Sequence, residues 1–107
     1  MLNQLVCVGR ITKNIEIVEG ENKKYATITV AIPRSYKNED GIYETDFITA
    51  RLWGGIAENA AEYCKKGDLV GIKGRLQSEK IEKEDGTIEY KMVVIAEKIT
   101  FLSSAKD

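Results

Sequence analysis

The chain contains no histidine, one proline, one tryptophan and two cysteines among its 107 residues. Without histidine, imidazole acid–base catalysis, Ser-His-Asp triads and imidazole metal sites are excluded. Cys7 and Cys64 stand apart, with neither CxxC spacing nor a third cysteine, so we expect buried free thiols and no disulfide. P-loop and GxGxxG sequences are also missing, and the acidic residues have no neighbouring nucleophile. These gaps favour a binding protein over an enzyme, and we expect no metal or cofactor.

No apolar run is long enough to span a bilayer, and the N-terminus lacks the basic region and apolar core of a signal peptide. We therefore expect a cytoplasmic protein. A length of 107 residues with 43% hydrophobic and 31% charged residues is typical of one globular domain. The net charge of −1 argues against a wholly basic surface, but it leaves room for a basic groove.

Alternation of apolar and polar residues predicts five strands and one helix. The first strand is interrupted at Gly9-Arg10, where a glycine indicates a bulge or bend. Pro33 ends the second strand, a polar loop at 34–41 follows, and the Gly54-Gly55 pair ends the third. The helical period at 56–65 is followed by Gly67 as its cap. The expected strands are residues 2–18, 24–32, 43–53, 69–81 and 88–102.

This order predicts an all-β fold, a five-stranded Greek-key barrel of the OB type with one short helix between strands three and four. A β-sandwich is the alternative, although a sandwich of this length would normally contain more and shorter strands. We expect one OB domain over residues 1–102 and a short flexible C-terminal end at 103–107.

The strand at 43–53 carries the most informative pattern in the chain. One parity ends in Ile48, Ala50 and Leu52, which suit a barrel interior. The opposite parity carries three aromatic residues and an arginine on a face that does not pack into the core: Tyr43, Phe47, Arg51 and Trp53. Such a face could stack flat rings, or it could cover a second packing layer or a subunit contact.

An OB barrel presents this kind of face to oligonucleotides or oligosaccharides. Single-stranded nucleic acid needs aromatic rings under its bases and cations along its phosphates. Tyr36 in the preceding loop adds a further ring. The candidate cations lie inside or beside the expected strands: Arg10, Lys13, Arg34, Arg51, Lys73, Arg75 and Lys80.

Four segments resemble the bacterial single-stranded DNA-binding proteins. The opening Met1-Leu-Asn-Gln-Leu-Val-Cys-Val-Gly-Arg is similar to the start of that family, and Thr45-Asp-Phe-Ile-Thr-Ala-Arg-Leu-Trp-Gly to its third strand. Ala57-Glu-Asn-Ala-Ala-Glu-Tyr-Cys-Lys-Lys-Gly-Asp-Leu-Val resembles its helix and helix exit. Gly71-Ile-Lys-Gly-Arg-Leu-Gln resembles its fourth strand. The similarity extends over residues 1–102.

The resemblance implies a homotetrameric OB protein that coats single-stranded DNA without sequence preference in replication, recombination and repair. It places base-stacking rings at Tyr36, Phe47 and Trp53, and basic residues at Arg10, Lys13 and Arg75. Replication or recombination proteins would be further partners. Two alternatives stay open: an accessory OB protein of the primosome type, which acts mainly through protein contacts, and an oligomerisation module whose aromatics form an interface.

The chain departs from the family in three places. Glu79 and Ile81 stand where the family usually has a basic residue and an aromatic residue, so one phosphate contact and one stacking ring are expected to be lost. Asn14-Ile15 replaces an acidic-proline pair. The chain ends at Asp107 without the long flexible segment and acidic tip that recruit partner enzymes in the family, so we expect either a short form of the family or a truncated chain.

Overall fold

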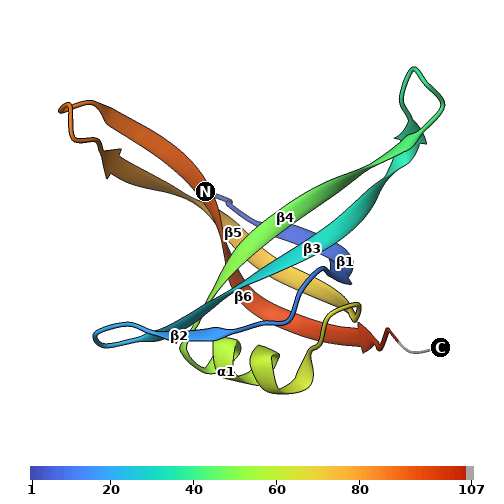
Figure 1. Ribbon diagram of the computed structural model, residues 1–107, viewed down its shortest axis with the longest axis horizontal. Helices are drawn as coiled ribbons and strands as arrows, with labels where there is room; N and C mark the ends of the chain where they lie inside the picture. Colours follow the sequence, from blue (N-terminus) through green and yellow to red (C-terminus); the bar gives the residue numbers. More distant parts are fainter. Residues whose placement is uncertain (106–107) are drawn as a thin grey trace.

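The computed structural model describes residues 1–105 and shows the predicted OB-fold, a closed β-barrel with one short helix (Figure 1). Hydrogen-bonded neighbours follow the order β1-β5-β6-β4-β3-β2, and an additional β1–β3 pairing closes the barrel. The elements are β1 (Leu5–Ile11), β2 (Ile17–Glu19), β3 (Lys24–Lys37), β4 (Tyr43–Trp53), α1 (Gly54–Tyr63), β5 (Leu69–Glu82) and β6 (Ile88–Ser103).

Alternation along the strands builds the barrel interior, as predicted. Where β3, β4 and β5 form the barrel, alternate residues are buried, and their side chains belong to a single apolar cluster. The largest fully buried side chains are Ile11, Ile28, Val30, Leu52, Val70 and Ile72. Because the inward side chains of β3, β4 and β5 form the core, the outward side chains of these strands can contact a ligand or another chain.

The predicted interruption at Gly9-Arg10 is wrong, since β1 runs through both residues without a break. The regular strand instead stops at residues 12–16, where Ile15 is buried in the core, and resumes as the short β2, which pairs only with β3. Gly9 is needed because β3 crosses close to β1 there, and a Cβ at this position would lie 2.7 Å from the carbonyl oxygen of Ala31. The glycine therefore permits a close approach of the two strands, and the register of β1 with β5 continues through it without a shift.

Pro33 does not end its strand either, because β3 continues to Lys37. The pairing of β1 with β3 covers only Arg10↔Ala31 and Ile11↔Val30, so beyond Ala31 the strand β3 has β4 as its only neighbour. A proline without an N–H is tolerated on such an edge. The extra length carries the β3–β4 hairpin well beyond the barrel (Figure 1).

The helix begins two residues earlier than predicted and ends earlier too. Gly54, with a φ of +55°, makes the sharp turn out of β4 and is already the first helical residue. Cys64 caps the helix, whereas Gly67, with a φ of +92°, lies in the turn that follows. Buried Ala57 and Ala60 face the barrel, and α1 covers one end of it (Figure 1).

Both cysteine thiols are free, as the sequence indicated, but only Cys64 is buried; Cys7 is half-buried on β1. Burial raises the pKa of both thiols. No helix within residues 1–105 has the length and apolar character needed to cross a bilayer.

The proposed end of the domain at residue 102 stays a prediction. Ser103 is the last residue of β6, and the backbone N–H of Ala105 donates to the buried Asp68 carboxylate at 3.0 Å. The start of the C-terminal end is thus held against the turn after α1. Residues 106–107 lie outside the described part of the chain.

Candidate nucleic-acid interface

The outer face of β3 and β4 carries a row of exposed aromatic rings. Phe47 is 67% exposed, Tyr43 is 55% exposed and Trp53 is 39% exposed, while Ala50 and Leu52 of the same strand are fully buried. The two-residue period of the strand therefore separates the rings from the core, as the sequence predicted. Tyr36, also exposed, lies on the same hairpin but in an irregular stretch between Pro33 and Lys37, so simple alternation does not set its direction.

Trp53 is the centre of a small cluster. The Tyr25 ring lies 5.4 Å from it, centroid to centroid, at an interplanar angle of 42°. The ammonium of Lys23 and the guanidinium of Arg51 lie over the indole, at 5.8 and 6.0 Å from its centroid. These distances fall within the range of cation–π attraction, about 6 Å. The cluster combines rings and cations in one place.

Tyr25 and Lys23 were not among the predicted site residues. Tyr25 pairs in register with Trp53 across β3 and β4, so both side chains leave the sheet on the same face. The alternation along β3 already indicates that Tyr25 points outward. That it lies opposite Trp53 follows only from the register between β3 and β4. Lys23 lies in the β2–β3 turn, and no periodic pattern marks such a position.

Arg51 does not point freely to solvent. Its guanidinium donates two hydrogen bonds to the carboxylate of Glu79 on β5, and both side chains are about one-third exposed or less. These hydrogen bonds hold the pKa of Glu79 below its usual value, so the carboxylate is ionised at neutral pH. A phosphate group would have to compete with Glu79 for Arg51.

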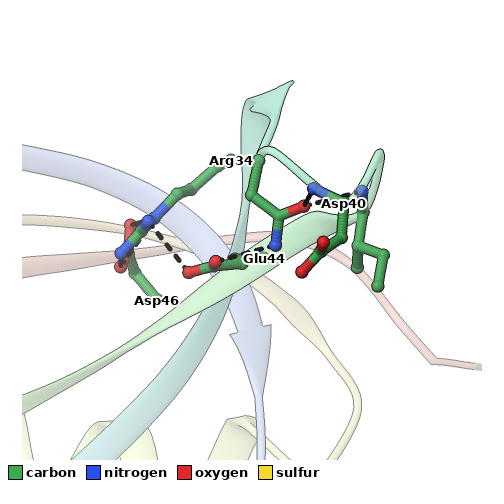
Figure 2. Close-up of polar contacts among 6 residues, drawn as sticks. Arg34, Asp40, Glu44 and Asp46 are labelled. Carbon is green, nitrogen blue, oxygen red and sulfur yellow. Dashed lines mark hydrogen bonds and ion pairs between the residues drawn. The ribbon is translucent and has the colours of Figure 1, made fainter.

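Arg34 is engaged in the same way on the β3–β4 hairpin (Figure 2). Its guanidinium holds the Asp46 carboxylate at 2.9–3.2 Å and reaches Glu44 at 3.1 Å. The hydrogen bonds raise the pKa of Arg34 and lower that of Asp46. Asn38 completes the network by donating to Glu44 and accepting from the backbone of the hairpin turn. This network stiffens the arm that carries Tyr36 and Tyr43.

The other predicted cations are distributed around the barrel. Arg75 donates to the Gln77 amide at 2.8 Å and lies 3.7 Å from the Glu97 carboxylate, while Arg10 donates to the carbonyl oxygen of Gly67 at 3.0 Å. Lys73 pairs in register with residues of β1 and β6, not with β3 or β4. Lysines 13, 73 and 80 are exposed and form no ion pair within residues 1–105.

Two depressions lie side by side on this face and share Thr27 of β3. One, of about 260 Å³, runs over β4 to β6 and includes Arg51 and Lys91. The other, of about 480 Å³, runs from Tyr25 to the 12–16 segment and includes Lys13 and Lys66. Together they cross the strands and pass the Trp53 cluster, which is a shape suited to an extended chain of bases and phosphates. Within residues 1–105, no group of three or more Cys, Asp or Glu side chains could hold a metal ion.

Comparisons with known proteins agree with this geometry. The chain is 40% identical over 103 residues to single-stranded DNA-binding protein B of Bacillus subtilis, covering 95% of this chain and 91% of the relative. It is 39% identical over 108 residues to single-stranded DNA-binding protein 1 of Clostridium acetobutylicum, covering 99% and 98%. It is 42% identical over 105 residues to single-stranded DNA-binding protein 3 of Streptococcus agalactiae, covering 97% and 76%. The sequence model of the single-strand binding protein family matches residues 2–102, and the chain belongs to that family.

Proposed function

We propose that this protein binds single-stranded DNA without sequence preference and protects it during replication, recombination and repair in the cytoplasm. The observation that carries the proposal is the row of exposed rings on β3 and β4, with Phe47 and Trp53 at its centre. Every base has a flat face, so stacking on such rings does not depend on sequence. The names of the relatives support DNA as the ligand. The protein acts by binding, with no catalytic step.

An accessory protein of the primosome type is not favoured, because the single-strand binding family matches residues 2–102 and the relatives are named single-stranded DNA-binding proteins. Titration with oligo-dT separates the possibilities. Tight binding is expected here, weak binding would indicate an accessory protein, and no binding would indicate that the rings serve an interface.

Binding should weaken as salt increases. Lysines 13, 23, 66 and 91 border the aromatic face or its depressions, and cations are released from the DNA when these groups neutralise phosphates. For single strands, a plot of log affinity against log salt concentration should have a slope of about −0.7 for each phosphate that is neutralised.

Trp53 is the only tryptophan in the sequence, and bases stacked on it should quench its fluorescence, which provides the titration signal. An affinity that does not change between dilute and physiological salt would contradict a role for these lysines.

We further propose that the protein is a homotetramer. Residues 5–9 of β1 pair with β5 on one side only, which leaves a strand edge open. On β1 itself Val6 is 67% exposed and Val8 is 48% exposed, and Leu102 of β6, 47% exposed, lies on the same face beyond Gly71 of β5. Apolar side chains beside an open strand edge are suited to self-association.

Light scattering should therefore give a mass close to four times the 12.0 kDa of one chain. Val8→Asp should lower that mass, because a carboxylate would be buried at the contact. A wild-type mass of one chain at micromolar concentration would rule out the assembly. A tetramer that persists in Val8→Asp would place the contact elsewhere.

A further inference from the structure

The larger depression on the outer face, here called the lysine groove, lies between β3 and the 12–16 segment. Its volume of about 480 Å³ falls within the range of clefts that hold small ligands, about 300–1,000 Å³. The residues that line it are Lys13, Asn14, Glu16, Val18, Tyr25, Thr27 and Lys66. They combine an aromatic ring, two ammonium groups and polar side chains, and Lys66 and Tyr25 were not predicted to bind DNA.

Hydrogen bonds hold the walls of the lysine groove in place. The backbone N–H of Lys66 donates to the side-chain oxygen of Asn14 at 3.1 Å, which ties the turn after α1 to the 12–16 segment. Gly67 donates to the carbonyl oxygen of Ile11 at 2.7 Å, and Thr12 to that of Thr29 at 2.9 Å. Both sides are therefore attached to the barrel, so the groove is formed before a ligand arrives.

The lysine groove continues the aromatic face. Tyr25 belongs to both, because its ring lines the groove and also packs against Trp53 at 5.4 Å. Thr27 joins the groove to the second depression, which passes Arg51. A strand of DNA whose base stacks on Trp53 would meet Tyr25 next, within the reach of a neighbouring nucleotide.

The ammonium groups of the groove differ from the guanidinium groups on the rest of the face. The guanidinium groups of Arg34 and Arg51 are bound to carboxylates, as described above. The ammonium groups of Lys13 and Lys66 form no ion pair within residues 1–105. One carboxylate, that of Glu16, is present among the lining residues, so the groove is left with an excess of positive charge. These lysines need not give up a partner to bind phosphate.

We propose that the lysine groove is a nucleotide subsite that follows Trp53 on the path of the DNA. Tyr25 stacks on a base, and Lys13 and Lys66 bind the flanking phosphates. The inference rests on the proposed function, since it needs single-stranded DNA as the ligand, and it extends the interface beyond the residues predicted from the sequence.

The test compares two neighbouring lysines in the full chain. Lys66→Gln should lower the affinity for oligo-dT at low salt by about two- to fivefold, the range of an exposed ionic contact. It should also reduce the salt slope by about 0.7, which corresponds to one phosphate. Lys65→Gln is the matched control, because Lys65 has the same charge and is also exposed but does not line the groove. Equal effects of the two substitutions on affinity and slope would overturn the subsite.

A second variant separates the ring from the charges. Tyr25→Leu should lower the affinity about fivefold or more without a change in salt slope, because stacking releases no cations. Thermal unfolding of each variant confirms that the barrel is intact. An unchanged affinity in Tyr25→Leu would overturn the stacking role. A wild-type protein that does not bind oligo-dT would instead overturn the proposed function itself, so the two failures are distinguishable.

Discussion

Phe47→Ala is expected to weaken oligo-dT binding by about 1–3 kcal/mol, the value of one base–ring stack. The ring is 67% exposed and projects from the outer face of β4, so removing it takes away a stacking surface and leaves the core intact. The unfolding temperature should therefore stay within about 2–4 °C of the wild type, the shift that a surface substitution of about 0.5 kcal/mol would cause. Fluorescence titration through Trp53 and thermal unfolding measure the two quantities.

Tyr63→Ala is the control for Phe47→Ala. Tyr63 is 66% exposed, but it lies at the end of α1, outside both depressions of the outer face. Its removal should leave DNA affinity unchanged. If Phe47→Ala unfolds the protein, or if it retains wild-type affinity, the ring is a packing or interface residue and the stacking arrangement is wrong.

Glu79→Gln is expected to tighten oligo-dT binding by roughly tenfold. The substitution removes a negative charge from the outer face and replaces the ion pair with at most one neutral hydrogen bond from Arg51 to the amide oxygen. The guanidinium can then bind phosphate with little competition, and charge-assisted hydrogen bonds of this kind contribute about 1.5–3 kcal/mol. Because one more phosphate is neutralised, the salt slope should steepen by about 0.7.

Two further variants show whether Arg51 is responsible. Glu89→Gln removes the same charge from an ion pair with Lys83 near the β5–β6 turn, and it should change affinity little. Arg51→Gln combined with Glu79→Gln should abolish most of the gain. A gain that survives without Arg51 would mean that Glu79 acts only through general repulsion. No gain at all would mean that DNA does not approach this part of β4 and β5.

The ion pairs leave the lysines, more than the arginines, to bind the phosphates of DNA. Arginines 34, 51 and 75 each have a carboxylate within 4 Å, so their charges are largely balanced before DNA binds. Exposed lysines, including Lys13 and Lys66, are the cations available without competition. This chain should therefore depend more on ring stacking than on charge. The substitutions at Phe47 and Glu79 test the two contributions separately.

Much of the fold was predictable because alternation is a local property of the chain. The bounds of β4 match the prediction, and those of β5 and β6 differ from it by one residue. The errors at Gly9 and Pro33 have a common cause. Local pattern predicts a bend at Gly9 and a strand end at Pro33, but the neighbouring strands decide both. Gly9 permits β3 to cross close to β1, and Pro33 is tolerated because β3 pairs with β4 alone there.

Part of the candidate site was also predictable, namely which side chains point away from the core. Parity placed Phe47 and Trp53 outside the core, and resemblance to a known family supported their role. Strand parity could not show that Arg51 contacts Glu79, because the two residues are 28 positions apart and lie on strands that are not hydrogen-bonded neighbours. Arg34 and Asp46 share one predicted hairpin, yet the irregular register after Pro33 hid their contact.

The sequence by itself determined which side chains leave the sheet and which enter it, since a strand repeats every two residues whatever surrounds it. It also determined the family, through residues 2–102. Only the tertiary structure decided which cations are free and where the face continues. Ion pairs and grooves depend on the tertiary arrangement of the closed barrel, in which β6 lies between β4 and β5 and the 12–16 segment lies beside β3. No local pattern encodes those distances.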